Sequence, residues 1–180
     1  MKKFLVFISL VLIAILLAGL YDAVHNQISY TVSPEYFTKF KFGQFGLDGL
    51  NLPDRLRASI VGFLASWWMG IPIGFLVGVV GFIHQRHRRM FKVSLWSFGV
   101  VIAFTLLFGL CGLLYGYFET RTINLANYQG WFIPDDVKDL RRFLCAGYMH
   151  NSSYLGGTLA ILVGWIFQTV VRIKTRDTAT

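Results

Sequence analysis

Charged residues are scarce in this chain. Of its 180 residues, 14% are Asp, Glu, Lys or Arg and 55% are hydrophobic, whereas about 25% of the residues in a soluble domain are charged. A soluble globular domain is therefore not expected. The apolar excess lies at residues 4–21, 58–83, 93–118 and about 147–171. Each run approaches or exceeds the ~20 residues with which a helix crosses a bilayer. The sequence predicts an all-α bundle of four transmembrane helices in a single membrane domain, 1–180.

Cysteine is almost absent, with two residues, Cys111 and Cys145. Cys111 lies well inside the third predicted span and Cys145 precedes the fourth, so a disulfide between them is not expected. Neither a CxxC nor a CxxCH motif occurs, so neither a zinc knuckle nor covalently attached haem is indicated. The chain also lacks a GxxxxGK phosphate loop and a GxSxG nucleophile elbow. No motif names a reaction, and whether the protein is an enzyme stays open.

The first apolar run has two interpretations. Lys2 and Lys3 precede it, as basic residues precede the apolar core of a secretory signal peptide. The run is long for such a core, however, and no A-x-A cleavage site follows it. We therefore expect residues 4–21 to form an uncleaved span.

Basic residues are distributed unevenly between the two sides of the predicted bundle. With four spans threaded, nine basic residues and one acidic residue lie on the side of the termini, and eight of each lie on the other side. By the positive-inside rule both termini are cytoplasmic, and the loops at about 22–57 and 119–146 are extracytoplasmic. Because these bases flank spans, we expect them to bind anionic lipid headgroups and not nucleic acid. The expected contacts lie in the tight loop HQRHRRMFK, at Arg86, Arg88, Arg89 and Lys92.

Small residues recur at helical spacing inside the second and third spans. Helices in membranes associate by close backbone approach, which small residues permit. The spacing predicts a glycine zipper, either within one chain or between copies in a homo-oligomer. Pro72 lies inside the second span and predicts a kink there. The zipper residues are Gly62, Ser66, Gly70, Gly74 and Gly78 in the second span, and Gly109, Gly112 and Gly116 in the third.

The two longer loops carry signals for helix starts. Ser33 is a candidate N-cap, with Pro34 at the first helical position and Glu35 in the first turn. The segments NLPDRLRASI and IPDDVKDLRRF place proline and acids before mixed apolar and charged residues. We expect short amphipathic helices on the extracytoplasmic face and a short extended piece at NQISYTV, residues 26–32.

Ionisable side chains gather near the outer ends of three spans. Asp22 and His25 stand three residues apart at the end of the first span, where a helix would place them on one face. Neutral imidazole and carboxylate together suit zinc, iron or manganese, and helical bundles build such sites from facing helices. The predicted metal ligands are His25, Glu35, Glu119 and His150, with Asn151 or Ser153 supporting His150.

Other interpretations of this cluster stay open. It can be structural, with Glu35 complementing a helix N-terminus and Glu119 paired with Arg121 or an arginine of DLRRF. A polar rim of this kind would position loops or dock a partner membrane protein, which is our first functional hypothesis. The second is a membrane metalloprotein, an oxidoreductase or a hydrolase. A third is a b-type haem protein with His25 and His150 as axial ligands.

Two segments carry a resemblance. HNQISYTVSPEYFTKF and MHNSSYLGG resemble parts of small four-span bacterial inner-membrane proteins that have no known activity. The resemblance implies a bacterial inner membrane, and it implies no ligand, substrate or functional residue.

Overall fold

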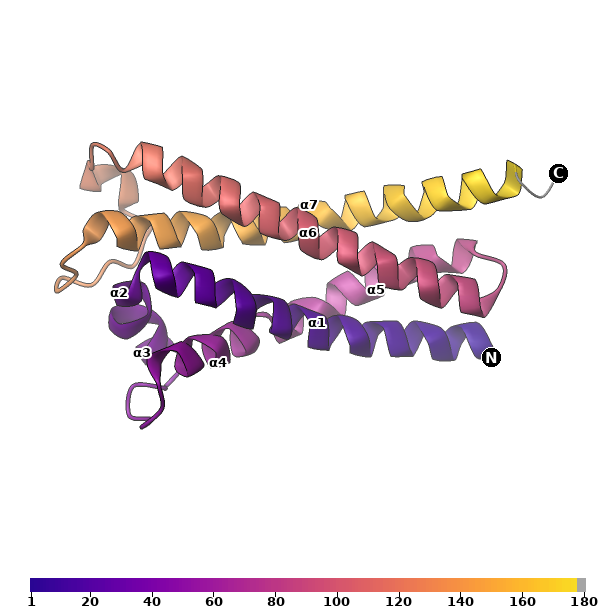
Figure 1. Cartoon of the computed structure of the whole chain (residues 1–180), viewed down its shortest axis with the longest axis horizontal. Helices are drawn as coiled ribbons and strands as arrows, with labels where there is room; N and C mark the ends of the chain where they lie inside the picture. Colours follow the sequence, from indigo (N-terminus) through magenta and orange to yellow (C-terminus); the bar gives the residue numbers. More distant parts are fainter. Residues whose placement is uncertain (178–180) are drawn as a thin grey trace.

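The structure, a computed structural model, describes residues 1–177, and in that range it contains helices and no strands (Figure 1). Four helices are long and apolar enough to cross a membrane. They are α1 (Lys2–Val32), the interrupted helix Asp54–Ile83, α6 (His87–Glu119) and α7 (Leu140–Asp177). The predicted all-α chain with four helices of membrane-spanning length and composition is confirmed.

The four spans form two tightly packed pairs. α1 packs along α4 (Asp54–Ser66) and α5 (Gly70–Val80), and α6 packs along α7. The two termini lie at the same end of the bundle, which we call the terminal end, and α1 runs antiparallel to α7 (Figure 1). The other end, which carries the longer connecting segments, is called the loop end. A site between α1 and α7 therefore lies between the two pairs.

Glycines bring the helices of each pair into backbone contact. A Cβ atom at Gly62 would lie 2.3 Å from the carbonyl oxygen of Asp22, and one at Gly70 would lie 2.4 Å from that of Ala14. In the other pair, a Cβ atom at Gly112 would lie 2.7 Å from the carbonyl oxygen of Tyr148. No larger residue fits at these positions without moving a helix, so the glycines set the distance between the spans.

The second span is broken at its centre. α4 ends at Ser66, whose backbone angles of φ −122° and ψ −14° are not helical, and the 3-10 turn η2 (Trp67–Met69) leads into α5. Pro72 explains the position of the break, because proline cannot donate to the carbonyl four residues earlier and its ring clashes with that carbonyl. The break leaves Ser66 facing α1 near its Asp22.

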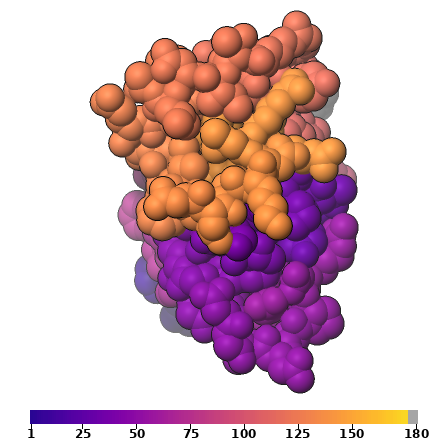
Figure 2. Space-filling view, turned by 90° about the vertical axis from the view of Figure 1, so that its left-hand side faces the viewer, coloured from indigo at the N-terminus to yellow at the C-terminus, as the bar shows by residue number. Residues whose placement is uncertain are grey.

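A compact segment covers the loop end. It comprises α2 (Pro34–Tyr36), the π-helical turn η1 (Phe37–Lys41) and α3 (Phe42–Gln44), and Ser33 caps α2 by accepting a hydrogen bond from Tyr36 N. Residues 33–57 and 120–140 together cover this end of the molecule (Figure 2), and the second of them includes the 3-10 turn η4 (Leu125–Tyr128). We call residues 33–44 the cap segment.

The helices extend further than the apolar runs predicted. The extended piece expected at residues 26–32 is wrong, because α1 continues without interruption to Val32. Asn26 and Ser29 are buried there and hydrogen-bonded, so tertiary contacts stabilise helix where local alternation indicated strand. Likewise α7 begins at Leu140, so the amphipathic segment DLRRF belongs to its first turns.

Candidate metal site

Three ligand-type side chains converge between α1 and α7. Asp22, His25 and His150 each offer one oxygen or nitrogen atom, and these atoms lie within 4.8 Å of one another. All three residues are buried, with exposed fractions of 4%, 1% and 4%. Two imidazoles and one carboxylate form a set that binds Zn²⁺, Fe²⁺ or Mn²⁺ and leaves further coordination positions open.

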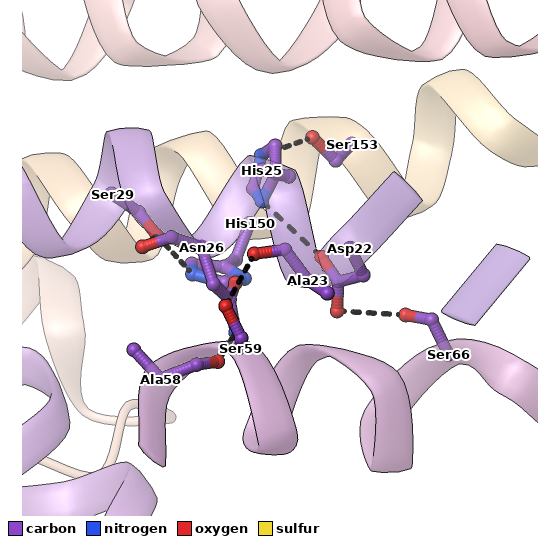
Figure 3. A network of polar contacts seen from close by, with 10 residues as sticks. All are labelled: Asp22, Ala23, His25, Asn26, Ser29, Ala58, Ser59, Ser66, His150 and Ser153. Carbon is purple, nitrogen blue, oxygen red and sulfur yellow. Dashed lines mark hydrogen bonds and ion pairs between the residues drawn. The ribbon is translucent and has the colours of Figure 1, made fainter. Parts of the chain in front are cut away.

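The continuous helix α1 supplies two of these ligands. Asp22, His25 and Ser29 follow one another at spacings of three and four residues, which places them on one face of the helix. Gly62 lets α4 approach the backbone at Asp22, and Asn26 donates to the carbonyl of Ala58 at 3.0 Å. The face that carries the ligands is thereby fixed against the second span and directed toward α7 (Figure 3).

The two histidines are held by a reciprocal pair of serine contacts. His25 Nε2 lies 3.0 Å from Ser153 Oγ of α7, and His150 Nε2 lies 3.2 Å from Ser29 Oγ of α1. The antiparallel helices each provide one histidine and one serine, and the segments HNQISY and HNSSY both begin with His-Asn. Between them the imidazole rings meet edge to face, with centroids 5.0 Å apart and an interplanar angle of 82°.

The serine contacts bear on which ring nitrogens are free to bind a metal. Ser29 Oγ lies 3.2 Å from His150 Nε2 and 3.5 Å from the carbonyl oxygen of Asn26. In the tautomer that carries its proton on Nε2, His150 donates to Ser29, Ser29 donates to the Asn26 carbonyl, and His150 Nδ1 keeps its lone pair. His25 Nδ1 lies 3.3 Å from Asp22 Oδ1, but no hydrogen bond of normal geometry joins them. A hydrogen bond from the distal ring nitrogen is the usual support for a metal-bound histidine.

Asp22 is the residue whose position most needs an explanation. A buried carboxylate inside a membrane span is costly unless a counter-charge or hydrogen bonds offset it. Ser66 lies at the break in the second span and faces α1, where it donates a hydrogen bond to Asp22 Oδ2 at 2.8 Å. On the same turns of α1, His25 Nδ1, Asn26 Oδ1 and Tyr21 Oη are buried without a hydrogen-bond partner. A cation at this position would offset the charge of the carboxylate.

The cap segment closes the site on the side of the loop end. Tyr36 stacks on His150, with ring centroids 5.0 Å apart and an interplanar angle of 18°, and Phe37 and Phe143 are buried beside it. Burial raises the pKa of Tyr36, so its phenol stays neutral. Glu35 fastens this arrangement by accepting hydrogen bonds from Lys138 N at 3.1 Å and Asp139 N at 2.8 Å, immediately before α7.

A cavity of about 70 Å³ adjoins the site on the opposite side. Asp22 and His150 line one end of it, together with Ser66, Ser153 and Tyr154. The remaining walls are mostly apolar and come from all four spans. The site therefore has room for an additional ligand on the side that faces the interior of the bundle.

The four residues predicted as ligands do not all meet. His25 and His150 come together, and Asp22 is their carboxylate neighbour. Glu35 binds the backbone before α7, which is the helix-terminus role left open by the sequence. Glu119 is exposed at the end of α6, and within residues 1–177 no ion pair joins it to an arginine.

The supporting residues also differ from expectation. Ser153, predicted to support His150, contacts His25 instead. Ser29 was not singled out in the sequence, and Ser66 was predicted only as a helix-packing residue. The spacing from His25 to Ser29 is a helical signal, but it has that meaning only if α1 is continuous. The two imidazoles also fit axial haem ligation poorly, because their edge-to-face contact leaves no room for a porphyrin plane between them.

Comparisons of the chain with models of known protein families, with curated proteins and with solved structures found no match.

Proposed function

We propose that this chain is an integral membrane metalloprotein that holds one divalent transition-metal ion between Asp22, His25 and His150. The observation that carries the proposal is the meeting of two imidazoles and a carboxylate, all buried, within 4.8 Å. Ligands near ~2.1 Å from one ion must lie somewhat closer together than that. Binding would therefore draw the three side chains closer together, and the metal would supply Lewis-acid or redox chemistry to a ligand in the cavity.

Metal analysis of the purified protein tests this proposal. After loading with Zn²⁺ or, without oxygen, with Fe²⁺, we expect about one ion per chain in the parent protein. Asp22→Asn keeps the size of the side chain and its contact with Ser66, and it should reduce the metal content to about a tenth or less, as should His25→Gln. A monodisperse elution profile shows that each variant is folded.

Glu119→Gln is the matched control, because it removes a carboxylate of the set predicted from sequence but outside the triad. We expect it to retain the metal content of the parent. A parent protein that stays well below one ion per chain after loading would refute the proposal. Metal loss in Glu119→Gln, with retention in Asp22→Asn, would favour the ligand set His25, Glu35, Glu119 and His150 instead.

Docking of a partner membrane protein at the loop end is the first hypothesis from the sequence, but we now prefer metal binding. A docking surface needs exposed side chains, and His25 and His150 are 1% and 4% exposed. Their polar contacts instead suit an interior site, or a purely structural polar cluster. The metal analysis separates the last two roles, because a structural cluster holds no ion.

We also propose that the terminal end faces the cytoplasm of a bacterial cell, in its inner membrane. The asymmetry of basic residues supports this orientation, and Arg86, Arg88, Arg89 and Lys92 would contact anionic headgroups there. Reporter fusions at the two termini test the orientation. A fusion partner active outside the cytoplasm at either end would contradict it.

A further inference from the structure

The cavity beside the triad has one polar end and one apolar body. Ala14 and Leu17 of α1, Ile73 of α5 and Val101 of α6 line the apolar body, and Asp22 lies at the polar end. The volume of about 70 Å³ is several times the 10–15 Å³ that a single water needs. Lining of this kind suits a molecule with a hydrocarbon chain and one polar group at its end.

Access to the cavity from water at the loop end is blocked. Tyr36 covers His150 directly, and the aromatic side chains around it, Phe37, Phe42 and Phe143, are each at most 1% exposed. The hydrogen bonds from the backbone of Lys138 and Asp139 to Glu35 hold this cover on α7. A ligand would have to displace a packed aromatic cluster to arrive from that side.

The exposure of the lining residues points to an opening between the spans instead. Among its lining residues, Tyr154 alone is exposed, at 42%, while Tyr21 and Ile102 are partly buried. Tyr154 lies on α7 more than three turns inside that helix, and the α1 lining begins at Ala14, well within the first apolar run. At this depth the surroundings of the bundle are lipid, so the opening faces the bilayer.

Electrostatics restrict the polar end of such a ligand. The opening lies at the depth of the hydrocarbon core, where an anionic end group would lose its water at high cost on the way to the site. A hydroxyl group is neutral, can donate to the carboxylate and can also offer its oxygen to a metal ion. The hydroxyl-bearing residues Ser66, Ser153 and Tyr154 also line the cavity, so its polar end suits a hydroxyl group.

We propose that the cavity takes, from the bilayer, the end of a neutral single-chain lipid with a terminal hydroxyl group, and that the lipid oxygen faces the triad of Asp22, His25 and His150. The proposal deepens the metal-site proposal and rests on it for the binding of the oxygen to an ion. The seating of the hydrocarbon chain in the cavity depends only on the lining and the opening.

Photolabelling in lipid nanodiscs tests the proposal. The probe is a long-chain alcohol with a diazirine in the middle of its chain, and labelled residues are identified by mass spectrometry. Ala18 lines the cavity, so Ala18→Phe fills it without altering a ligand of the triad. The matched control is Leu20→Phe, which adds a ring on the 56% exposed side of the same helix.

In the parent and in Leu20→Phe we expect labels on the cavity lining. In Ala18→Phe we expect a loss of about tenfold, with the metal content of all three proteins the same. The corresponding fatty acid probe, which adds an anion, should label the lining less than the alcohol does. Equal labelling of the lining in Ala18→Phe and in the parent would overturn the proposal, and equal labelling by acid and alcohol would overturn its neutral end.

Failure of this inference and failure of the metal site are distinguishable. A parent protein without metal whose labelling still responds to Ala18→Phe would refute the metal site and keep the lipid chain in the cavity. A parent protein with one ion per chain whose labelling ignores Ala18→Phe would keep the metal site and refute the lipid ligand.

Discussion

At the scale of single residues, the two serines that contact the histidines are the most informative feature of the site. Ser153 and Ser29 lie on different helices and each reaches the histidine of the other helix. A hydroxyl group in this position holds the orientation of an imidazole. If the histidines were purely structural, the serine contacts would still stabilise the fold, but their loss would not change the affinity for a metal.

Removal of a serine hydroxyl should therefore weaken metal binding. We expect Ser153→Ala to lower the affinity for Zn²⁺ by about 10–100-fold, because His25 loses the partner of Nε2. The unpartnered nitrogen should also destabilise the metal-free protein by about 1–3 kcal/mol. Titration against a chelator measures the first effect and thermal unfolding the second.

The control for this prediction is Thr158→Ala, on the same helix, whose hydroxyl donates only to the carbonyl of Tyr154 on an exposed face. It should leave the Zn²⁺ affinity at the value of the parent. A Ser153→Ala protein that is less stable but binds Zn²⁺ as the parent does would assign Ser153 a structural role alone.

At the scale of the elements, the distance between α1 and α4 decides whether Asp22 can face the site. The backbone of Gly62 is helical and would accept any residue. Glycine is needed there because a Cβ atom would collide with the carbonyl oxygen of Asp22. Gly99 on α6 is the useful contrast, because a Cβ atom there would meet nothing within 4 Å. The same substitution at the two positions therefore has opposite expected signs.

We expect Gly62→Ala to destabilise the protein by about 1–3 kcal/mol, since the added methyl group overpacks the contact between α1 and α4. Gly99→Ala should stabilise it by about 0.5–1 kcal/mol, because alanine loses less conformational freedom in a helix than glycine does. Unfolding in mixed detergent and SDS micelles measures both. Two changes of the same sign would show that the spans are not held at the distance described.

The elements also show what the sequence could predict about the fold. Length and hydropathy were sufficient for four spans, and Pro72 was sufficient for an irregularity in the second span. The alternation in residues 26–32 wrongly predicted an extended piece, because a local pattern does not show that Asn26 and Ser29 are buried against other helices. The sequence prediction therefore left residues 26–32, which include Ser29, outside the first helix.

At the scale of the whole molecule, pairing of the spans decided which candidate ligands meet. The sequence placed two histidines and three carboxylates at similar depth, but periodicity does not say which helices are neighbours. α1 and α7 face each other across the two pairs, so His25 and His150 meet, while Glu119 at the end of α6 remains exposed. The fold of the cap segment, which takes Glu35 to the backbone before α7, depends on contacts more than 100 residues apart.

A buried histidine, His84, lies near the terminal end in the link between α5 and α6. Its side chain is fully buried and both ring nitrogens lack a hydrogen-bond partner. Burial, together with the positive charges of Arg89, Arg172 and Lys3, lowers the pKa of His84 below its ordinary value of 6.5. These charges come from α6, α7 and α1, so a protonated His84 would be repelled by basic residues of three helices.

The stability of the protein should consequently fall as the pH is lowered through about 6.5. Below that pH the unfolded chain binds a proton at position 84 and the folded chain does not, so the free energy of unfolding decreases. The apparent melting temperature in nanodiscs, measured from pH 8 to about pH 5, should decline less steeply for His84→Gln than for the parent. His87→Gln, three residues away, should follow the parent, and the same slope in His84→Gln and the parent would contradict the prediction. Because the triad is unchanged in all three proteins, any pH dependence that it contributes cancels in this comparison, and the difference in slope belongs to the terminal end of the bundle.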